Sequence, residues 1–232
     1  DAVRTIAPEL SERQVLFEFV LDQRLESEPL DRFTVLVLPT VLSLSEKQAR
    51  AVRQYVEAGG SCLVVGELGV MNATGQPTAE TGVFGTGLTP DKVIPVGNGQ
   101  VARIAPGQAG DAMEWIKRLS SEEPLSAIEA SWKVRAAAFD RPNGLALHVV
   151  NYDRDEEAAK GKRGPKSELP IPVRNTKVNL NLPPNARVES VTLRSQDQPN
   201  PRALKFTTPG GRLQFTIPEI EVYGVVDVRF GD

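Results

Sequence analysis

A strand, a helix and a second strand follow one another within residues 33–65, and this order constrains the fold more than any other feature of the sequence. The segment contains two apolar runs, at 33–38 and 62–65. Between them, Ser45 and Gln48 are suited to a helix capping box, and Gly59 with Gly60 is suited to a helix end. Apolar runs without polar alternation are typical of strands in a parallel sheet that is covered on both faces. Because a crossover through a helix is right-handed, the two strands are predicted to lie parallel.

Shorter elements surround this unit in the first half of the chain. A strand, a loop, a hairpin and a helix are expected at 16–21, 66–87, 93–104 and 111–119, respectively. Pro39 is expected to end the strand that starts at Phe33, because proline lacks the N–H that a strand ladder uses.

Beyond Pro124 the hydrophobic period becomes two, as in strands with one buried face. Seven short strands are expected, at 134–136, 145–150, 178–182, 188–193, 204–206, 213–217 and 222–228. Turn-forming residues separate several of them, at 142–144, 183–185, 199–201 and 209–211. This spacing predicts an antiparallel β-sandwich. The segment 153–169 mixes acidic and basic residues and is expected to be a solvated loop.

The change of period divides the chain into two expected domains. Residues 1–124 are predicted to form an α/β domain with a three-layer parallel sheet, and residues 125–232 an all-β sandwich domain. A chain of 232 residues is long enough for either one large domain or two small ones.

Composition narrows the classes of function. The 27 basic and 30 acidic residues give a net charge of −3, which disfavours a nucleic-acid partner. The single cysteine excludes an intramolecular disulfide and a cysteine-based zinc site, and the single histidine excludes a site with two imidazoles. No stretch approaches the ~20 apolar residues of a membrane span. We expect a soluble protein, cytoplasmic or exported, with no cofactor, no metal and no membrane partner.

Two residues could serve as a nucleophile or a base. A nucleophilic cysteine needs a tight turn after a strand and a nearby histidine, whereas Cys62 starts its strand and the glycine pair precedes it. We therefore interpret Cys62 as a buried structural thiol. His148 lies between Leu147 and Val149, and alternation places it on the outward face of a strand. No catalytic residue is predicted.

Glu67 and Asn72 are the polar residues of the first half that are best placed to bind a ligand. Glu67 follows the apolar run of the second strand, and ligands bind outside the carboxyl ends of strands in open parallel sheets. The simpler interpretation, an acidic loop residue in water, is favoured.

Several stretches resemble bacterial β-galactosidases of the glycoside hydrolase family 42 type. They are 33–39, the helix from Ser45, 55–65 and 96–101 in the first half, and 147–152, 182–195, 215–218 and 222–226 in the second. The resemblance implies a trimerisation domain with the flavodoxin-like fold of a class I glutamine amidotransferase, followed by the C-terminal β domain of those enzymes. It also implies that the first strand of the sheet is missing or cut short at Asp1.

The departures from that family are informative. The catalytic (β/α)₈ barrel, which holds both catalytic glutamates in the family, has no counterpart in the sequence. The amidotransferase Cys–His–Glu triad has no match either, because Cys62 is misplaced and His148 lies in the second domain. The resemblance therefore implies a non-catalytic accessory or oligomerisation region in carbohydrate metabolism. Its implied partners are an upstream catalytic barrel, a neighbouring subunit or another copy of the chain.

Two alternatives remain open. A carbohydrate-binding module would use exposed aromatic side chains of the sandwich, but the seven aromatic residues after Pro124 mostly occupy apolar strand positions and are expected in the core. A small-ligand site at the end of the parallel sheet would use Glu67 and Asn72.

Overall fold

The computed structural model describes residues 2–78, 83–84, 88–120, 125–155, 169–196 and 198–231. The chain divides into two compact units: unit 1 comprises Asp1–Glu9 and Phe19–Pro124, and unit 2 comprises Leu10–Glu18 and Leu125–Asp232. The segment Leu10–Glu18 therefore groups with the β-rich unit and not with the α/β part in which the sequence pattern places it. Most of the charged segment 153–169, namely 156–168, lies outside the described residues.

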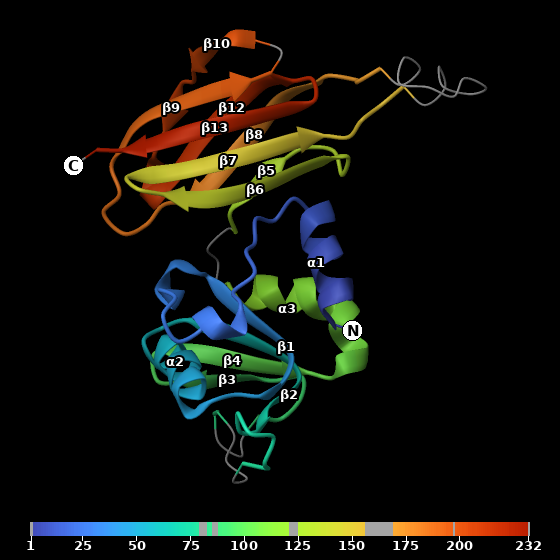
Figure 1. Cartoon of the computed structure of the whole chain (residues 1–232), viewed down its shortest axis with the longest axis vertical. Coiled ribbons are helices and arrows are strands. Elements are labelled where there is room, and N and C mark those ends of the chain that lie inside the picture. Colours follow the sequence, from blue (N-terminus) through green and yellow to red (C-terminus); the bar gives the residue numbers. More distant parts are fainter. Residues whose placement is uncertain are drawn as a thin grey trace. The chain divides into compact units, whose positions relative to one another are not determined.

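Unit 1 is built around one sheet with the strand order β1-β2-β4-β3 (Figure 1). Its strands are β1 Val35–Ser43, β2 Ser61–Met71, β3 Val93–Val96 and β4 Gly99–Ile104. β1 pairs with β2 in parallel and β2 pairs with β4 in parallel, while β3 and β4 form an antiparallel hairpin. The hairpin turn at Gly97 and Asn98 agrees with the glycine-rich pattern there.

Helix α2, Glu46–Glu57, connects the two parallel strands β1 and β2. It begins with a capping box, in which the Gln48 N–H donates to Ser45 Oγ at 3.1 Å and the Ser45 N–H donates to Gln48 Oε1 at 2.8 Å. The helix ends at Glu57 with Ala58 as its C-cap, and Gly59 follows with a φ of 124° that favours glycine. Local signals alone thus position this helix.

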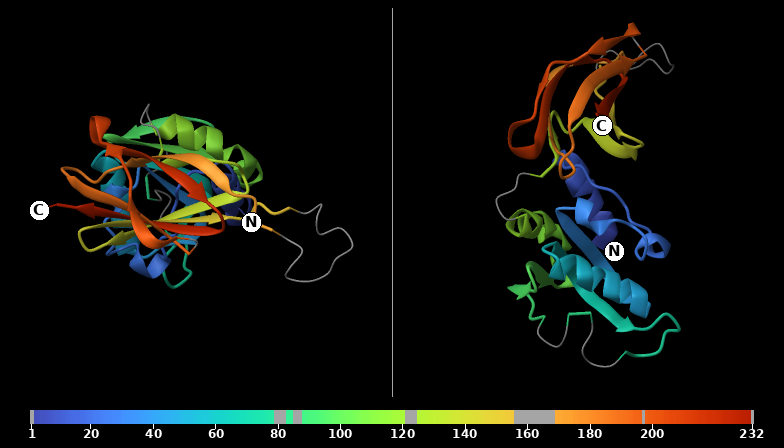
Figure 2. Two further views of the ribbon diagram at one scale, coloured as in Figure 1. Left: turned by 90° about the horizontal axis from the view of Figure 1, so that it is seen from above. Right: turned by 90° about the vertical axis from the view of Figure 1, so that its left-hand side faces the viewer.

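Helices cover both faces of the sheet (Figure 2). Val52 and Val56 of α2 share one hydrophobic cluster with Cys62 and Val64 of β2. Alternation turns Leu63 and Val65 to the other face, where α3, Ala112–Leu119, packs on β2 and β4. The remaining helices of unit 1 are the 3₁₀ turns Asp22–Arg24, Leu30–Arg32 and Pro106–Asp111, and helix α1, Ala2–Glu12, begins in unit 1 and ends in unit 2.

The two central strands are longer than the pattern predicts. β1 continues through Pro39 to Ser43, and β2 continues through Gly66 to Met71, so neither strand ends where it was expected to end. β1 is an edge strand of the sheet, and an edge position tolerates proline because no further strand needs its N–H. The pairing of β1 with β2 shifts register between Pro39 and Val41, and the two strands pair again beyond that shift.

The prediction of a strand at 16–21 is wrong. In the structure only an isolated bridge, Val15 with Ala127, forms next to this segment, and Phe19 and Leu21 are exposed. An apolar run becomes a strand only where its pairing with a neighbouring strand continues as a ladder, and here the structure forms a single bridge at Val15 and a bond from the Leu16 N–H to the Ser126 carbonyl at 2.9 Å. Helix α1, which contains Pro8, was not predicted.

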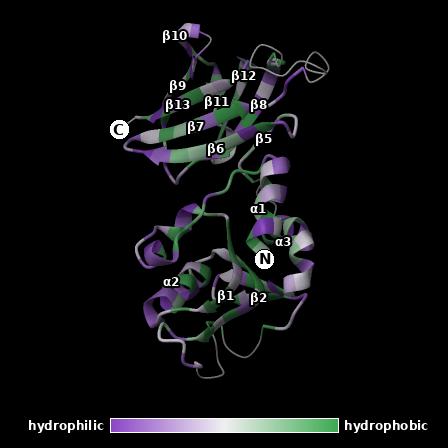
Figure 3. Cartoon of the chain, turned by 45° about the vertical axis from the view of Figure 1, so that its right-hand side comes forward, coloured by the Kyte–Doolittle hydropathy of each residue, from purple (hydrophilic) through white to green (hydrophobic). Residues whose placement is uncertain are grey.

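Unit 2 consists of two antiparallel sheets with the strand orders β10-β9-β13-β7-β6 and β11-β12-β8-β5. Its strands are β5 Ala127–Glu129, β6 Val134–Arg141, β7 Gly144–Asn151, β8 Val173–Asn181, β9 Val188–Ser195, β10 Gln198–Ala203, β11 Phe206–Thr207, β12 Arg212–Ile220 and β13 Tyr223–Phe230, with a 3₁₀ turn at Pro209–Gly211. The inner faces of both sheets contribute to one hydrophobic cluster, to which Leu147, Val226 and Ile217 belong. Figure 3 shows the hydrophobic residues concentrated along the strands.

Three elements of unit 2 differ from the expected pattern. Of the strand expected at 204–206, only Phe206 lies in a strand, the short β11. Pro199 and Pro201 were predicted to form a turn but lie in β10, an edge strand whose pairing with β9 shifts register between Gln198 and Arg202. The short strand β5 was not predicted, because three residues give too little periodicity to read. Within the described part of the chain, no helix is long and apolar enough to cross a membrane.

Candidate functional site

The hairpin turn between β6 and β7 forms one wall of the candidate site. Arg141 pairs with Gly144 across the turn, so Pro142 and Asn143 are its two central residues. Asn143 has a φ of 59°, and proline followed by a residue with positive φ is the combination that a type II turn favours. The sequence pattern at 142–144 predicted this turn.

Gly144 lets the neighbouring strand approach closely. A Cβ atom at this position would collide with the carbonyl oxygen of Val228 in β13. Next to this contact, the Phe230 N–H donates a hydrogen bond to the Asn143 carbonyl at 2.9 Å. The turn and the end of β13 are therefore held side by side, and their side chains share one surface.

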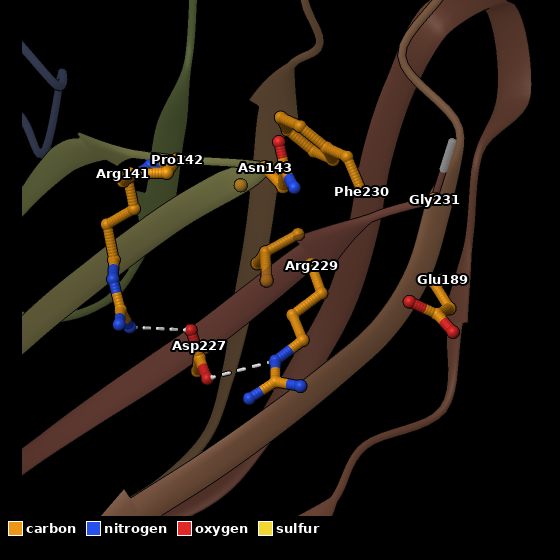
Figure 4. A pocket seen from close by; sticks show the side chains of 10 residues that line it. Arg141, Pro142, Asn143, Glu189, Asp227, Arg229, Phe230 and Gly231 are labelled. Carbon is orange, nitrogen blue, oxygen red and sulfur yellow. Dashed lines mark hydrogen bonds and ion pairs between the residues drawn. The ribbon is translucent and has the colours of Figure 1, made fainter.

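Alternation along β13 places two charged residues on the outer face of the five-stranded sheet. Val226 and Val228 point into the core, so Asp227 and Arg229 point outward. Arg141 Nη1 lies 2.8 Å from Asp227 Oδ1, and Arg229 Nε lies 3.7 Å from Asp227 Oδ2 (Figure 4). The Asp227 carboxylate is thus fixed between two guanidinium groups.

These residues line a cavity of about 440 Å³. Glu189 from β9 and the chain end at Phe230 and Gly231 complete its lining. The volume falls in the range of small-molecule sites, ~300–1,000 Å³. The lining carries two arginines and two carboxylates, so its formal charges balance.

A diagonal row of ring side chains crosses the same outer face next to the cavity. Phe139 of β6 contacts His148 of β7 edge to face, with ring centroids 5.1 Å apart. His148 Nδ1 lies 2.6 Å from the Tyr223 hydroxyl of β13, and this hydrogen bond fixes the orientation of both rings. His148 therefore lies on the outer face, as its alternation predicted, and bonds to a phenol.

Aromatic exposure differs from the expectation for the second half of the chain. Phe215 is buried, but Trp132, Phe139 and Tyr152 are 63%, 55% and 61% exposed. The apolar character of the surrounding strands does not decide burial, because only one face of each sheet meets the core. The expectation of a core position holds for Phe206, Phe215 and Phe230, which belong to or pack against the core cluster, and fails for the three exposed aromatic residues.

The thiol of Cys62 is buried and does not lie in the cavity. Its side chain is 0% exposed, and burial raises its pKa. Burial also raises the pKa of Tyr55, with the nearby Cys62 as a second cause, while the Tyr55 hydroxyl donates to the carbonyls of Phe33 and Ser61 at 3.0 and 3.2 Å. A neutral, buried thiol cannot act as a nucleophile, which agrees with the structural role predicted for Cys62.

The structure places Glu67 and Asn72 in different settings. Glu67 lies within β2 and is exposed, and does not follow the strand as its position in the pattern suggested. Asn72 Oδ1 accepts hydrogen bonds from the Thr74 N–H at 3.0 Å, the Thr74 hydroxyl at 2.8 Å and the Gln76 N–H at 2.9 Å. Asn72 thus organises its own turn, and ligand binding at these two residues stays a prediction.

The sequence pattern did not single out the cluster of Arg141, Asp227 and Arg229. The available signal was the alternation of charged with apolar residues in β13, but 86 residues separate Arg141 from Asp227 and only the sheet order brings them together. In the described ranges, no group of three or more His, Cys, Asp or Glu side chains is arranged to hold a metal ion.

Comparison with known proteins identifies solved structures that share this fold. No protein-family model and no curated protein matches the sequence. An α-L-fucosidase, isoenzyme 2, from Paenibacillus thiaminolyticus aligns with a TM-score of 0.59 and 16% identity, over 100% of this chain and 45% of that protein. A β-galactosidase from Bacillus circulans sp. alkalophilus aligns with a TM-score of 0.55 and 12% identity, over 97% of this chain and 37% of that protein.

A third structure, a GH42 β-galactosidase from G. stearothermophilus, aligns with a TM-score of 0.51 and 11% identity, over 99% of this chain and 36% of that protein. The fold is one found in glycoside hydrolases. At these identities the likeness concerns the fold alone. The chain spans less than half the length of each of these three proteins.

Proposed function

We propose that this chain is a non-catalytic accessory and oligomerisation region of a glycoside-hydrolase-like protein that acts in carbohydrate metabolism. Unit 1 would serve as the amidotransferase-like trimerisation domain, and unit 2 as the β-sandwich that braces it. The observation that carries the proposal is the extent of the fold likeness, which takes in at least 97% of this chain but at most 45% of the three structures compared above.

The chemistry of the described residues supports a non-catalytic role. The only thiol is buried with a raised pKa, and the only imidazole is bonded to the Tyr223 hydroxyl. Asp227 is engaged by two arginines. General acid–base catalysis needs an acid and a base that converge on one substrate atom, whereas His148 Nδ1 and the Asp227 carboxylate are each turned to a partner within the sheet.

Exposed apolar residues of unit 1 support a packing role. Leu42 near the end of β1 and Val70 and Met71 at the end of β2 are 40%, 37% and 38% exposed. They lie close together, because β1 and β2 pair up to Ser43 and Met71. Contiguous exposed apolar surface marks interaction sites, and we propose that another copy of the chain covers these strand ends.

Activity assays test the non-catalytic role. The purified chain should not hydrolyse aryl β-galactosides or aryl α-L-fucosides, the substrate classes that the names of the structural neighbours suggest. Turnover that co-elutes with the protein peak through successive purification steps would refute the proposal.

Light scattering tests the oligomerisation role. The chain should elute as an oligomer, and Val70→Asp should shift it to the monomer, because a charge would be buried at the contact. Glu67→Gln changes an exposed side chain on the same strand and should leave the mass unchanged. A monomeric wild-type chain would contradict the oligomerisation role.

A further inference from the structure

We propose that the cavity at the β6–β7 turn and the ring side chains beside it form a binding site for a neutral oligosaccharide. The inference goes beyond the proposed function, because it concerns unit 2 alone and does not depend on how unit 1 packs. The residues that would contact the ligand are Arg141, Asp227, Arg229, Glu189 and Phe139.

Charge balance in the cavity favours a neutral ligand. Arg141 and Arg229 bring two positive charges, and Asp227 and Glu189 bring two negative charges. An anionic ligand such as phosphate or a uronate would gain little from a site whose net charge is zero, and a metal ion would meet the two guanidinium groups. A neutral ligand with many hydroxyl groups avoids both costs.

The polar groups of the cavity also match hydroxyl groups in kind. A sugar hydroxyl both donates and accepts hydrogen bonds, so it is satisfied by a site that offers guanidinium donors and carboxylate acceptors together. Each arginine carries five N–H donors, of which Asp227 takes only some. The Asp227 side chain is only 12% exposed and is fixed by both arginines, so the hydrogen-bonding directions are set before a ligand arrives.

Phe139 supplies the apolar surface that a sugar ring needs on one of its faces. Phe139 and Asp227 are both paired with Ala146, so they lie in the same row across the sheet, with the small Ala146 between them. Their separation is two strand spacings, about 10 Å. A ligand that reaches both must be longer than one sugar unit, so we assign one unit to the cavity and the next to the Phe139 ring.

The hydrogen bond of His148 holds the Phe139 platform in place. His148 contacts the Phe139 ring edge to face, and the Tyr223 hydroxyl fixes the imidazole at 2.6 Å. Phe139 is therefore 55% exposed while its ring also contacts an imidazole of fixed orientation. An aromatic ring with a fixed orientation loses little entropy when a ligand stacks on it.

Calorimetric titration of the whole chain tests the site. The probes are neutral di- and trisaccharides of galactose and of glucose, with sulfate and galacturonate as anionic comparisons. We expect saturable binding of at least one neutral oligosaccharide, weakened about tenfold or more by Asp227→Asn and by Arg229→Ala, because each removes hydrogen bonds to a charged group. Phe139→Ala should weaken binding about threefold to tenfold.

Two matched variants serve as controls. Arg174→Ala removes an exposed arginine that pairs with Glu219 on the other sheet of unit 2, and Trp132→Ala removes an exposed aromatic outside the row. Both should bind the oligosaccharide as the wild type does. If Asp227→Asn unfolds, Arg229→Ala still tests the cavity, because the Arg229 side chain is 65% exposed.

The proposal is overturned if no neutral oligosaccharide binds saturably, or if sulfate or galacturonate binds more tightly than the neutral sugars. It is also overturned if binding survives in Asp227→Asn and Arg229→Ala, or if the two controls lose it equally.

Discussion

The Gln14 side-chain amide donates to the Val134 carbonyl at 2.8 Å and to the Ser131 carbonyl at 2.9 Å. Gln14 is 6% exposed and has a φ of 61°, so its backbone adopts a conformation that glutamine rarely takes. Together with the bridge between Val15 and Ala127, these bonds attach the segment Leu10–Glu18 to the start of β6. A residue near the N-terminus thereby belongs to the core of unit 2.

Replacing Gln14 should destabilise unit 2. Gln14→Ala removes both side-chain hydrogen bonds, of which the one to Val134 is buried and the one to Ser131 is partly buried, and we expect a loss of about 1–3 kcal/mol in the free energy of unfolding. Urea denaturation followed by tryptophan fluorescence measures it. Gln23→Ala, at an exposed position, should change stability by less than about 0.5 kcal/mol, and equal effects of the two changes would argue against the role of Gln14.

Gly144 should tolerate no side chain. Gly144→Ala places a Cβ against the Val228 carbonyl, and because backbone atoms cannot move aside cheaply, we expect a loss of about 1–3 kcal/mol. Gly110→Ala is the matched control, because a Cβ at Gly110 meets no atom within 4 Å. Thermal unfolding of the two variants should separate them clearly, and similar melting temperatures would contradict the close approach of β13.

The thiol of Cys62 should be unreactive in the folded protein. It is fully buried and its pKa is raised, so the thiolate that reacts with Ellman's reagent is scarce and inaccessible. We expect no reaction in native buffer and the release of one equivalent in denaturant, since the chain has one cysteine. Rapid labelling of the native protein would show that the cysteine is accessible and would reopen a chemical role for it.

Stability should fall at alkaline pH because of the same thiol. The ordinary pKa of a cysteine is 9.0, and in the folded protein it lies higher, so above pH 9 the unfolded chain releases a proton that the folded chain retains. Unfolding is therefore favoured as pH rises, by up to about 1.4 kcal/mol per pH unit. Tyr55, whose pKa is also raised by burial, adds to this loss above pH 10.

The variant Cys62→Ala isolates the contribution of the thiol. Its unfolding free energy, measured in urea at several pH values, should fall less steeply above pH 9 than that of the wild type, whatever the offset between the two proteins at neutral pH. Because Cys62 contributes to the raised pKa of Tyr55, the slopes are compared between pH 9 and pH 10, below the ordinary tyrosine pKa of 10.0. Parallel curves would show that the Cys62 pKa is not raised by folding.

Local signals in the sequence were sufficient for several elements. The capping box at Ser45, the glycine after Ala58 and the apolar runs on either side account for β1, α2 and β2 with their parallel pairing. Pro142 and Asn143 account for the turn that forms one wall of the cavity. Each of these depends on residues within a few positions of one another, where backbone sterics and short hydrogen bonds decide the conformation.

Local signals failed where pairing with a distant strand decides the outcome. The run at 16–21 has the composition of a strand but is not one in the structure, where a single bridge forms at Val15. Pro199 and Pro201 have the composition of a turn but lie at a sheet edge that accepts them. Glu67 was expected to follow a strand, but β2 continues past it to Met71. The reason is that β1 also extends and pairs with this part of β2.

The sequence by itself determined the two patterns of hydrophobic period, the position of α2 and the chemical inertness expected of its single cysteine. Only the tertiary structure decided that Leu10–Glu18 joins unit 2 and that Arg141 meets Asp227. The reason is physical: a helix cap or a turn is stabilised by neighbours in the chain, but a sheet brings together residues that are distant in sequence, and their contacts depend on strand order and register.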